Sequence, residues 1–207
     1  MSILKLIFSL IALSLLSGCQ SFELEHSSMK TVVQKKNVKK VAIIPFENLT
    51  PNVKAGEDMA KFTYNQFFTH LYKNYLGKIG PYSFKMIDEP LLDEIMHKNK
   101  WLDQTVHLDV GLDTLMKELG CDILVLGTVS EYHYKRGLGE DPVVGLHLRL
   151  YDGETKTVIW SGSHSSVGRF SWFVEDALSR LGQQVSSYLT KRCFNELHTQ
   201  TSYAGKH

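Results

Sequence analysis

The side chains with the most reactive chemistry in this chain are its 3 cysteines and 9 histidines. The histidines form neither an H-E-x-x-H motif nor a cysteine–histidine pattern with the spacing of a zinc site. Ser163 and His164 are neighbours, and a strand would direct them to opposite faces, so they do not begin a catalytic triad. Gly137-Leu138-Gly139 is a lone G-x-G before a strand and is typical of a turn. We therefore expect no metal, no cofactor and no enzymatic activity, although catalytic residues can also come from distant segments.

The first nineteen residues indicate the cellular compartment. Lys5 precedes an apolar or small run from Leu6 to Leu16, which is followed by Ser17-Gly18-Cys19. This is the order of an export signal, and the run is shorter than the roughly 20 residues of a membrane-spanning helix. The end of this segment resembles the lipobox of bacterial lipoproteins, which implies cleavage before Cys19 and acylation of that cysteine. An ordinary secretory signal is the alternative.

Gln20 follows Cys19 where an aspartate is associated with retention at the inner membrane, so the resemblance implies the periplasmic face of the outer membrane. The chain has 23 Lys+Arg and 22 Asp+Glu, and loss of residues 1–18 removes Lys5 and no acid. The mature chain then has 22 basic and 22 acidic side chains and no net charge. A nucleic-acid partner is therefore not expected.

Cys121 and Cys193 remain once Cys19 carries lipid. In an oxidising periplasm they could form a disulfide, provided that their Cα atoms lie within about 7 Å. The alternative is two buried, inert thiols that pack as small hydrophobic side chains. The sequence leaves both open.

The length and composition favour a single globular domain. Of 207 residues, 43% are hydrophobic and 22% are charged, and there are 5 prolines. We divide the chain into a signal peptide (1–18), a lipidated cysteine with a lysine-rich tether (19–40), one α/β domain (41–194) and a tail without a signal for order (195–207).

Hydrophobic spacing predicts the elements of that domain. Strands are expected at 41–46, 84–87 and 123–134, and an antiparallel hairpin at 144–160. Helices are expected at 57–75, after Asp88, up to a left-handed cap at Gly120, and from Ser171 to about Leu189. The predicted fold class is α/β, a single three-layer-like domain with a mixed sheet, an antiparallel C-terminal hairpin and helices packed on the sheet.

Two stretches resemble a broad superfamily of periplasmic α/β domains. They run from Val41 to Thr50 (VAIIPFENLT) and from Gly120 to Gly127 (GCDILVLG). The superfamily is related to the N-terminal domain of the Tol-system B protein, and it includes the curli secretion lipoprotein and lipoprotein activators of penicillin-binding proteins. The resemblance implies a periplasmic, lipid-anchored α/β domain over residues 41–192.

A more specific resemblance covers residues 131–190. The stretches from Glu131 to Gly137, from Glu140 to Leu146 and from Val158 to Ser163 resemble the Pel exopolysaccharide export lipoproteins. This implies a ring-forming subunit beneath an outer-membrane porin, with loop acids that guide a cationic polysaccharide. Glu140 and Asp141 match that loop. Lys135 and Arg136 lie beside them, so a solvated hairpin tip is the alternative.

The segment from Phe170 to Phe173 contains three aromatic residues at the expected start of the last helix. Aromatic side chains are favourable at a membrane interface. The Pel resemblance implies such a role for Trp172, with Phe170 beside it. The alternative is a hydrophobic staple against the first turn of the helix.

Three functions are compatible with these residues. We favour a non-catalytic accessory lipoprotein of exopolysaccharide export that forms a homo-oligomer and binds a porin. A second is a regulatory lipoprotein that acts on an envelope enzyme such as a peptidoglycan synthase. A third is a secretion component like the curli lipoprotein.

Overall fold

The structure is a computed structural model that describes residues 24–29, 38–73, 78–79, 82–98, 111–135, 141–168 and 177–204. These residues form an eight-stranded mixed sheet. In spatial order it contains β1 (Leu24–Met29), β8 (Thr157–Val167), β7 (Asp141–Asp152), β6 (Ile123–Lys135), β2 (Val38–Ile43), β5 (Tyr82–Met86) and β4 (Lys78–Ile79), and β3 (Glu47–Asn48) pairs with β6. The strand β2 is parallel to β5 and β6, and β3 is parallel to β6. The strands from β6 through β7 and β8 to β1 are antiparallel.

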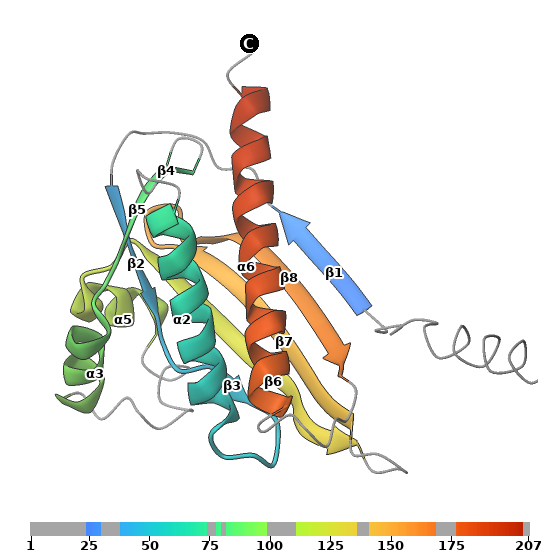
Figure 1. Ribbon diagram of the computed structural model, residues 1–207. Coiled ribbons are helices and arrows are strands. Elements are labelled where there is room, and N and C mark those ends of the chain that lie inside the picture. The colour runs from blue at the N-terminus through green and yellow to red at the C-terminus, as the bar shows by residue number, and fades with distance from the viewer. Residues whose placement is uncertain are drawn as a thin grey trace, which may run out of the picture.

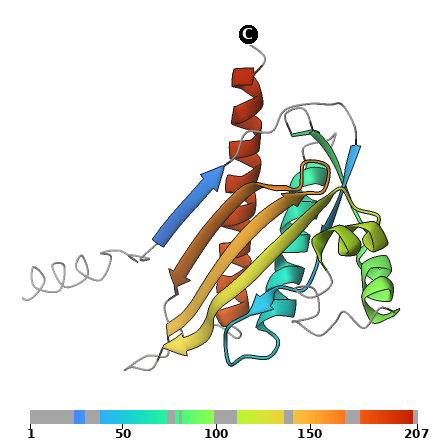
Figure 2. The same cartoon turned by 180° about the vertical axis from the view of Figure 1, so that it is seen from behind.

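Helices lie on both faces of the sheet (Figures 1 and 2). The helices α2 (Ala55–Lys73) and α6 (Ala177–Ala204) lie side by side on one face. The helices α3 (Glu89–Lys98) and α5 (Leu112–Leu119) lie on the other face, over β2 and β5. The predicted fold class, a mixed α/β sheet with an antiparallel hairpin and packed helices, is confirmed.

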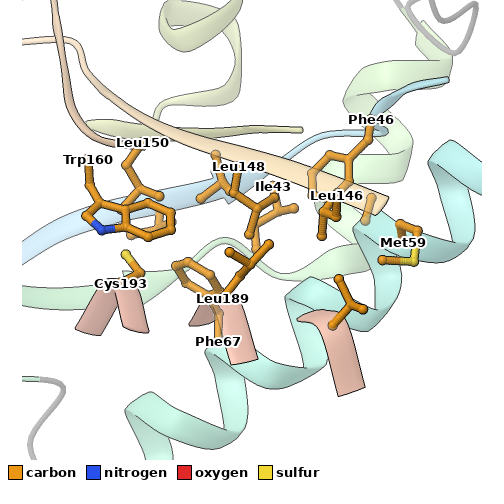
Figure 3. Close-up of a cluster of buried hydrophobic side chains, with 14 of the residues drawn as sticks. Ile43, Phe46, Met59, Phe67, Leu146, Leu148, Leu150, Trp160, Leu189 and Cys193 are labelled. Atoms are coloured by element: carbon orange, nitrogen blue, oxygen red, sulfur yellow. The ribbon is translucent and has the colours of Figure 1, made fainter. Parts of the chain in front are cut away.

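The larger hydrophobic core lies between the sheet and the pair α2 and α6 (Figure 3). Alternate residues of β7, among them Leu146, Leu148 and Leu150, point into it because side chains alternate between the faces of a strand. The helices contribute residues at helical spacing, and Trp160 is fully buried against them. Residues that meet in Figure 3 include Ile43, Phe46, Met59, Phe67, Leu189 and Cys193.

The smaller core lies on the opposite face. Leu124 points into it, whereas its neighbours Ile123 and Val125 point into the larger core, so β6 is covered on both sides at its start. The helix α5 ends at Gly120, which has φ 62° and ψ 34°. This left-handed conformation is the cap that the sequence predicts, and it suits glycine because glycine has no Cβ to clash.

The structure corrects two of the expected boundaries. The expected tether contains β1, which pairs with β8 along all of its length, from Leu24 with Ser165 to Met29 with Trp160. The expected tail is part of α6, which continues to Ala204. Leu197 is buried there, and Glu196 accepts a hydrogen bond from Trp160 Nε1 at 2.8 Å. Both segments are ordered by tertiary partners that local periodicity does not reveal.

A buried ion pair connects the start of β2 with the end of β7. Lys39, which the sequence places in a solvated tether, is 8% exposed, and its Nζ lies 2.8 Å from Asp152 Oδ1. Asp152 also accepts hydrogen bonds from Glu154 N and Thr155 Oγ1, which lie in the turn to β8. The pair therefore joins two strands that lie on either side of β6.

In the part of the chain that the structure describes, none of the helices has the length and apolar character to cross a bilayer.

Candidate functional site

The strands β6, β7 and β8 present a polar face on the side of the sheet away from α2 and α6. Val144 and Leu146 point into the larger core, so Gly145 and His147 point to the opposite side. Figure 2 shows this side from behind, and none of the described helices lies over the central parts of β7 and β8 there. We call the polar side of β6, β7 and β8 the open sheet face.

The open sheet face contains a hollow of about 560 Å³. Its polar lining comes from three strands and includes Glu131, His133, Lys135, His147, Ser163 and Ser165. Ser165 Oγ donates a hydrogen bond to Glu131 Oε2 at 2.6 Å. The site is thus assembled across strands by the register of the sheet.

An irregularity in β6 shapes this hollow. The register with β7 shifts between Val129 and Glu131, which is a β-bulge at Ser130. Opposite it, a Cβ on Gly145 would lie 2.6 Å from Ser130 Oγ and 3.1 Å from Glu131 Oε2. Glycine at position 145 therefore leaves the room in which Glu131 meets Ser165.

The open sheet face carries polar groups of several kinds. Hydroxyl, carboxylate, imidazole and ammonium groups lie on it together, so it can both donate and accept hydrogen bonds. Ser165 bonds directly to a carboxylate, which is not the serine–histidine geometry of an activated nucleophile. Within the described residues, no group of three or more His, Cys, Asp or Glu side chains is arranged to hold a metal.

Asp141, one of the two expected polymer-guiding residues, lies at one end of this face. Asp141 begins β7 and is half-buried, and its Cα partner in the ladder is Lys135 at the end of β6. Opposite charges therefore face each other at the base of the hairpin tip. Glu140 lies outside the described residues.

The residues expected at the membrane are also outside the described part of the chain. These are Cys19, Phe170 and Trp172. Gly168, the last described residue before Phe170, donates its N–H to Pro142 O at 2.8 Å. The last described residue before Phe170 therefore lies next to the start of β7.

Cys121 and Cys193 are both free thiols, so the disulfide alternative is wrong. Cys193 lies in the larger core and Cys121 in the smaller core, on opposite faces of the sheet. Burial raises the pKa of Cys121 to about 12, with a further contribution from the charge of Asp122. Burial also raises the pKa of Cys193, and Glu196 adds to this effect. Both thiols are therefore unreactive, as the second alternative predicts.

The loop between β3 and α2 exposes apolar side chains that the local sequence does not predict. Leu49 is 64% exposed and Val53 is 81% exposed. The loop is held by its own polar groups: Asn48 Nδ2 donates to Asn52 O at 2.6 Å, and Thr50 N donates to Asn48 Oδ1 at 2.9 Å. We call residues 49–54 the apolar loop. The asparagine and proline residues predict a turn here. They do not predict that the apolar side chains of the turn face solvent, which only the folded structure shows.

A second hollow, of about 630 Å³, lies between α2 and the start of α3. The rings of Tyr64 and Phe68 stack there with centroids 6.4 Å apart, and Tyr64 Oη donates to Ile87 O at 3.2 Å. Burial raises the pKa of Tyr64, and the charges of Asp88 and Glu89 reinforce this shift. The expected function does not account for this hollow.

Comparison with known proteins identifies the fold. No protein-family model matches the sequence, and no curated protein matches it. The structure is similar to a PelC dodecamer from Paraburkholderia phytofirmans, with a TM-score of 0.50 and 17% identity over 81% of this chain and 94% of that chain. It is also similar to the lipoprotein GNA1162 from Neisseria meningitidis, with a TM-score of 0.55 and 19% identity over 75% and 98% of the two chains. The chain thus has a PelC-like fold, as the resemblance predicts.

Proposed function

We propose that this chain is a non-catalytic lipoprotein, acylated at Cys19, that forms a ring beneath an outer-membrane porin and assists the export of a Pel-like exopolysaccharide. The observation that carries the proposal is the fold, which matches most of a protein crystallised as a dodecamer. GNA1162, the second neighbour, is described as a lipoprotein, which fits an anchored role.

Ring formation requires two different surfaces on each subunit. A head-to-tail contact joins one patch of a copy to another patch of the next, and a ring results when the rotation closes. The open sheet face supplies one such surface, because its polar groups come from three strands of a rigid sheet. We propose that it lies at a subunit boundary or at the lumen of the ring.

The hairpin tip between β6 and β7 is our candidate for contact with the polymer. Glu140 and Asp141 would supply the negative charge that guides a cationic chain. Lys135 lies opposite Asp141, so the net field at the tip is small and Glu140 would contribute most of it. Replacing Lys135 with glutamine should then strengthen the guiding field.

At the membrane, we propose that Trp172 and Phe170 contact the periplasmic leaflet of the outer membrane beside the acylated Cys19. Replacing Trp172 with alanine should weaken docking to vesicles without changing the oligomer. Leu91→Ala, which removes an exposed apolar side chain of α3 outside this aromatic segment, is the matched control.

Light scattering of the acylated chain in detergent and of residues 20–207 in buffer tests the proposal. A discrete oligomer larger than a dimer, constant over a range of concentrations, is the expected result. A monomer in both preparations would overturn the ring. Export of polysaccharide from cells that lack the gene, complemented with wild type or with the Cys19→Ser variant, tests the role itself. Wild type should restore export, and the variant should not.

A further inference from the structure

The strand β1 determines where a lipid at Cys19 can lie relative to the fold. Leu24 pairs with Ser165 near the end of β8. Five Cα–Cα steps separate Cys19 from Leu24, and each spans at most about 3.6 Å, so the two residues are at most roughly 18 Å apart. A bilayer that holds the lipid must therefore lie close to this end of β8.

The apolar loop lies at the same level of the sheet. Glu25 pairs with His164, His164 with Leu146, and Leu146 with Val129. These paired residues form one row across the sheet. Leu49 N donates to Val129 O at 3.0 Å, so the apolar loop lies at the end of this row. Since neighbouring strands are about 4.8 Å apart, the four steps of the row span about 19 Å.

The views agree with this register. Figures 1 and 2 both show the loop after β3 at the same end of the molecule as the end of β8 and the start of α6. Gly168, the last described residue before Phe170 and Trp172 in the sequence, also lies at this end, beside Pro142. Leu24, Gly168 and the apolar loop therefore lie at one end of the fold.

The conformation of the apolar loop holds its hydrophobic side chains at the surface. Hydrogen bonds within the loop hold its backbone, and Ala55, which follows it, is fully buried. The charged residue of the loop is Lys54, and residues 49–56 contain no acid. Two exposed apolar side chains and one lysine suit a membrane surface, where apolar acyl chains lie beneath anionic head groups.

We infer that the apolar loop docks on the bilayer to which Cys19 is anchored, with Leu49 and Val53 inserted among the lipids and Lys54 at the anionic head groups. The inference rests on the proposed acylation of Cys19. It assigns to the loop a function in orientation: together with β1 it would hold the sheet at a defined angle to the membrane.

A depth-sensitive label tests the docking. The Val53→Cys variant of the acylated full chain is labelled with an environment-sensitive fluorophore and placed in vesicles of phosphatidylethanolamine and phosphatidylglycerol. Cys121 and Cys193 are buried, so the new thiol is the one that reacts. The Lys117→Cys variant, labelled in the same way, is the control, because Lys117 is exposed on α5 near the β7–β8 turn at the other end of the sheet.

We expect bromine-labelled acyl chains to quench the label at position 53 and to leave the label at position 117 unchanged. Insertion of an apolar label at least as large as the valine that it replaces corresponds to about tenfold or more in partitioning, so quenching by aqueous iodide should fall roughly tenfold at position 53. Leu49→Ser in the same labelled chain should reverse part of this protection.

Each contrary result has a distinct meaning. If the protein floats with vesicles and mass spectrometry shows the acylated cysteine, but position 53 stays open to iodide, the docking is wrong and the anchor stands. If position 53 is protected from iodide but not quenched by the lipid chains, another copy of the protein covers the loop and the bilayer is not its partner. If the chain is not acylated and does not float, the proposed function itself fails.

Discussion

The buried ion pair between Lys39 and Asp152 allows a quantitative test of the fold. The Lys39→Met variant removes the ammonium and leaves the Asp152 carboxylate, which is 1% exposed, without its charged partner. Loss of one partner of a buried pair costs about 3–5 kcal/mol. Because Asp152 keeps its hydrogen bonds from Glu154 N and Thr155 Oγ1, we expect the lower end, about 3 kcal/mol, in the free energy of unfolding.

A double-mutant cycle separates the pair from other effects of the substitutions. Asp152→Asn alone removes the buried carboxylate next to Lys39 and leaves the largely exposed Glu154, 3.3 Å away, as a charged partner, and it should also lower stability by about 3 kcal/mol. The double variant removes both charges and keeps a side-chain acceptor for the turn, so its loss should be only about 1–2 kcal/mol. The coupling free energy is then about 4 kcal/mol. Urea unfolding followed by circular dichroism measures each of these values.

The same pair predicts a response to pH. Burial by itself lowers the pKa of Lys39, but the hydrogen bond and charge of Asp152, together with Glu154, outweigh it and raise the pKa above the ordinary 10.5. The pair therefore contributes fully below about pH 10.5, and its contribution is lost as the pH rises through the raised value. Above pH 10.5 the wild type should lose stability faster than the double variant.

The control is Lys156, whose Nζ lies 2.6 Å from Asp113 Oδ2 in an exposed pair. Lys156→Met should leave the urea midpoint unchanged within error, because solvent screens exposed charges. If Lys39→Met costs less than about 1 kcal/mol, or if the two single losses simply add, then the pair does not hold β2 to β7 and the reasoning is refuted.

Three further predictions concern the cores. Gly127→Ala would bring a Cβ into steric overlap with the Phe46 ring and should cost about 1–3 kcal/mol. Phe46→Leu in the same chain should recover part of this loss in urea unfolding, whereas strictly additive losses would disprove the contact. Cys121 and Cys193 should not react with a thiol reagent at pH 8 in the folded protein, and both should react in urea. A fast reaction of the native state would contradict their burial. Leu197→Ala should lower stability by about 2–5 kcal/mol, because Leu197 is 4% exposed. An unchanged unfolding midpoint would show that this part of α6 does not pack against the larger core.

The order of the longer elements within the expected domain was predictable from local patterns, whereas the two-residue strands β3 and β4 were not predicted. The apolar run of Ile123–Leu126, the helical spacing in α2 and the glycine after α5 each depend on residues that are close in sequence. The hairpin of β7 and β8 was predictable for the same reason, because alternation and the turn at Asp152-Gly153 are local signals.

The elements that local sequence patterns do not predict depend on distant partners. The local sequence of β1 predicts a polar tether. The segment is a strand because its backbone pairs with β8, more than 130 residues later. The end of α6 reads as a tail because its apolar positions are few. Phe194 and Leu197 become core residues only when β8 and α2 lie beneath them.

The candidate site was predictable only in part. The resemblance pointed to the stretch that begins at Glu131 and to Asp141, but not to the contact of Glu131 with Ser165. That contact depends on the β-bulge at Ser130 and on the space above Gly145, which are properties of the paired strands. The apolar loop was missed because exposure is decided by the fold around a residue.

The sequence by itself determined the fold class, the expected lipid attachment at Cys19 and the helix cap at Gly120, because each depends on a few neighbouring residues. Only the tertiary structure decided that the two remaining cysteines lie on opposite faces of the sheet, that Lys39 is buried against Asp152, and that β1 and the apolar loop share one end of the molecule. The register of the sheet brings these distant segments together, and register is a property of paired strands that no single segment contains.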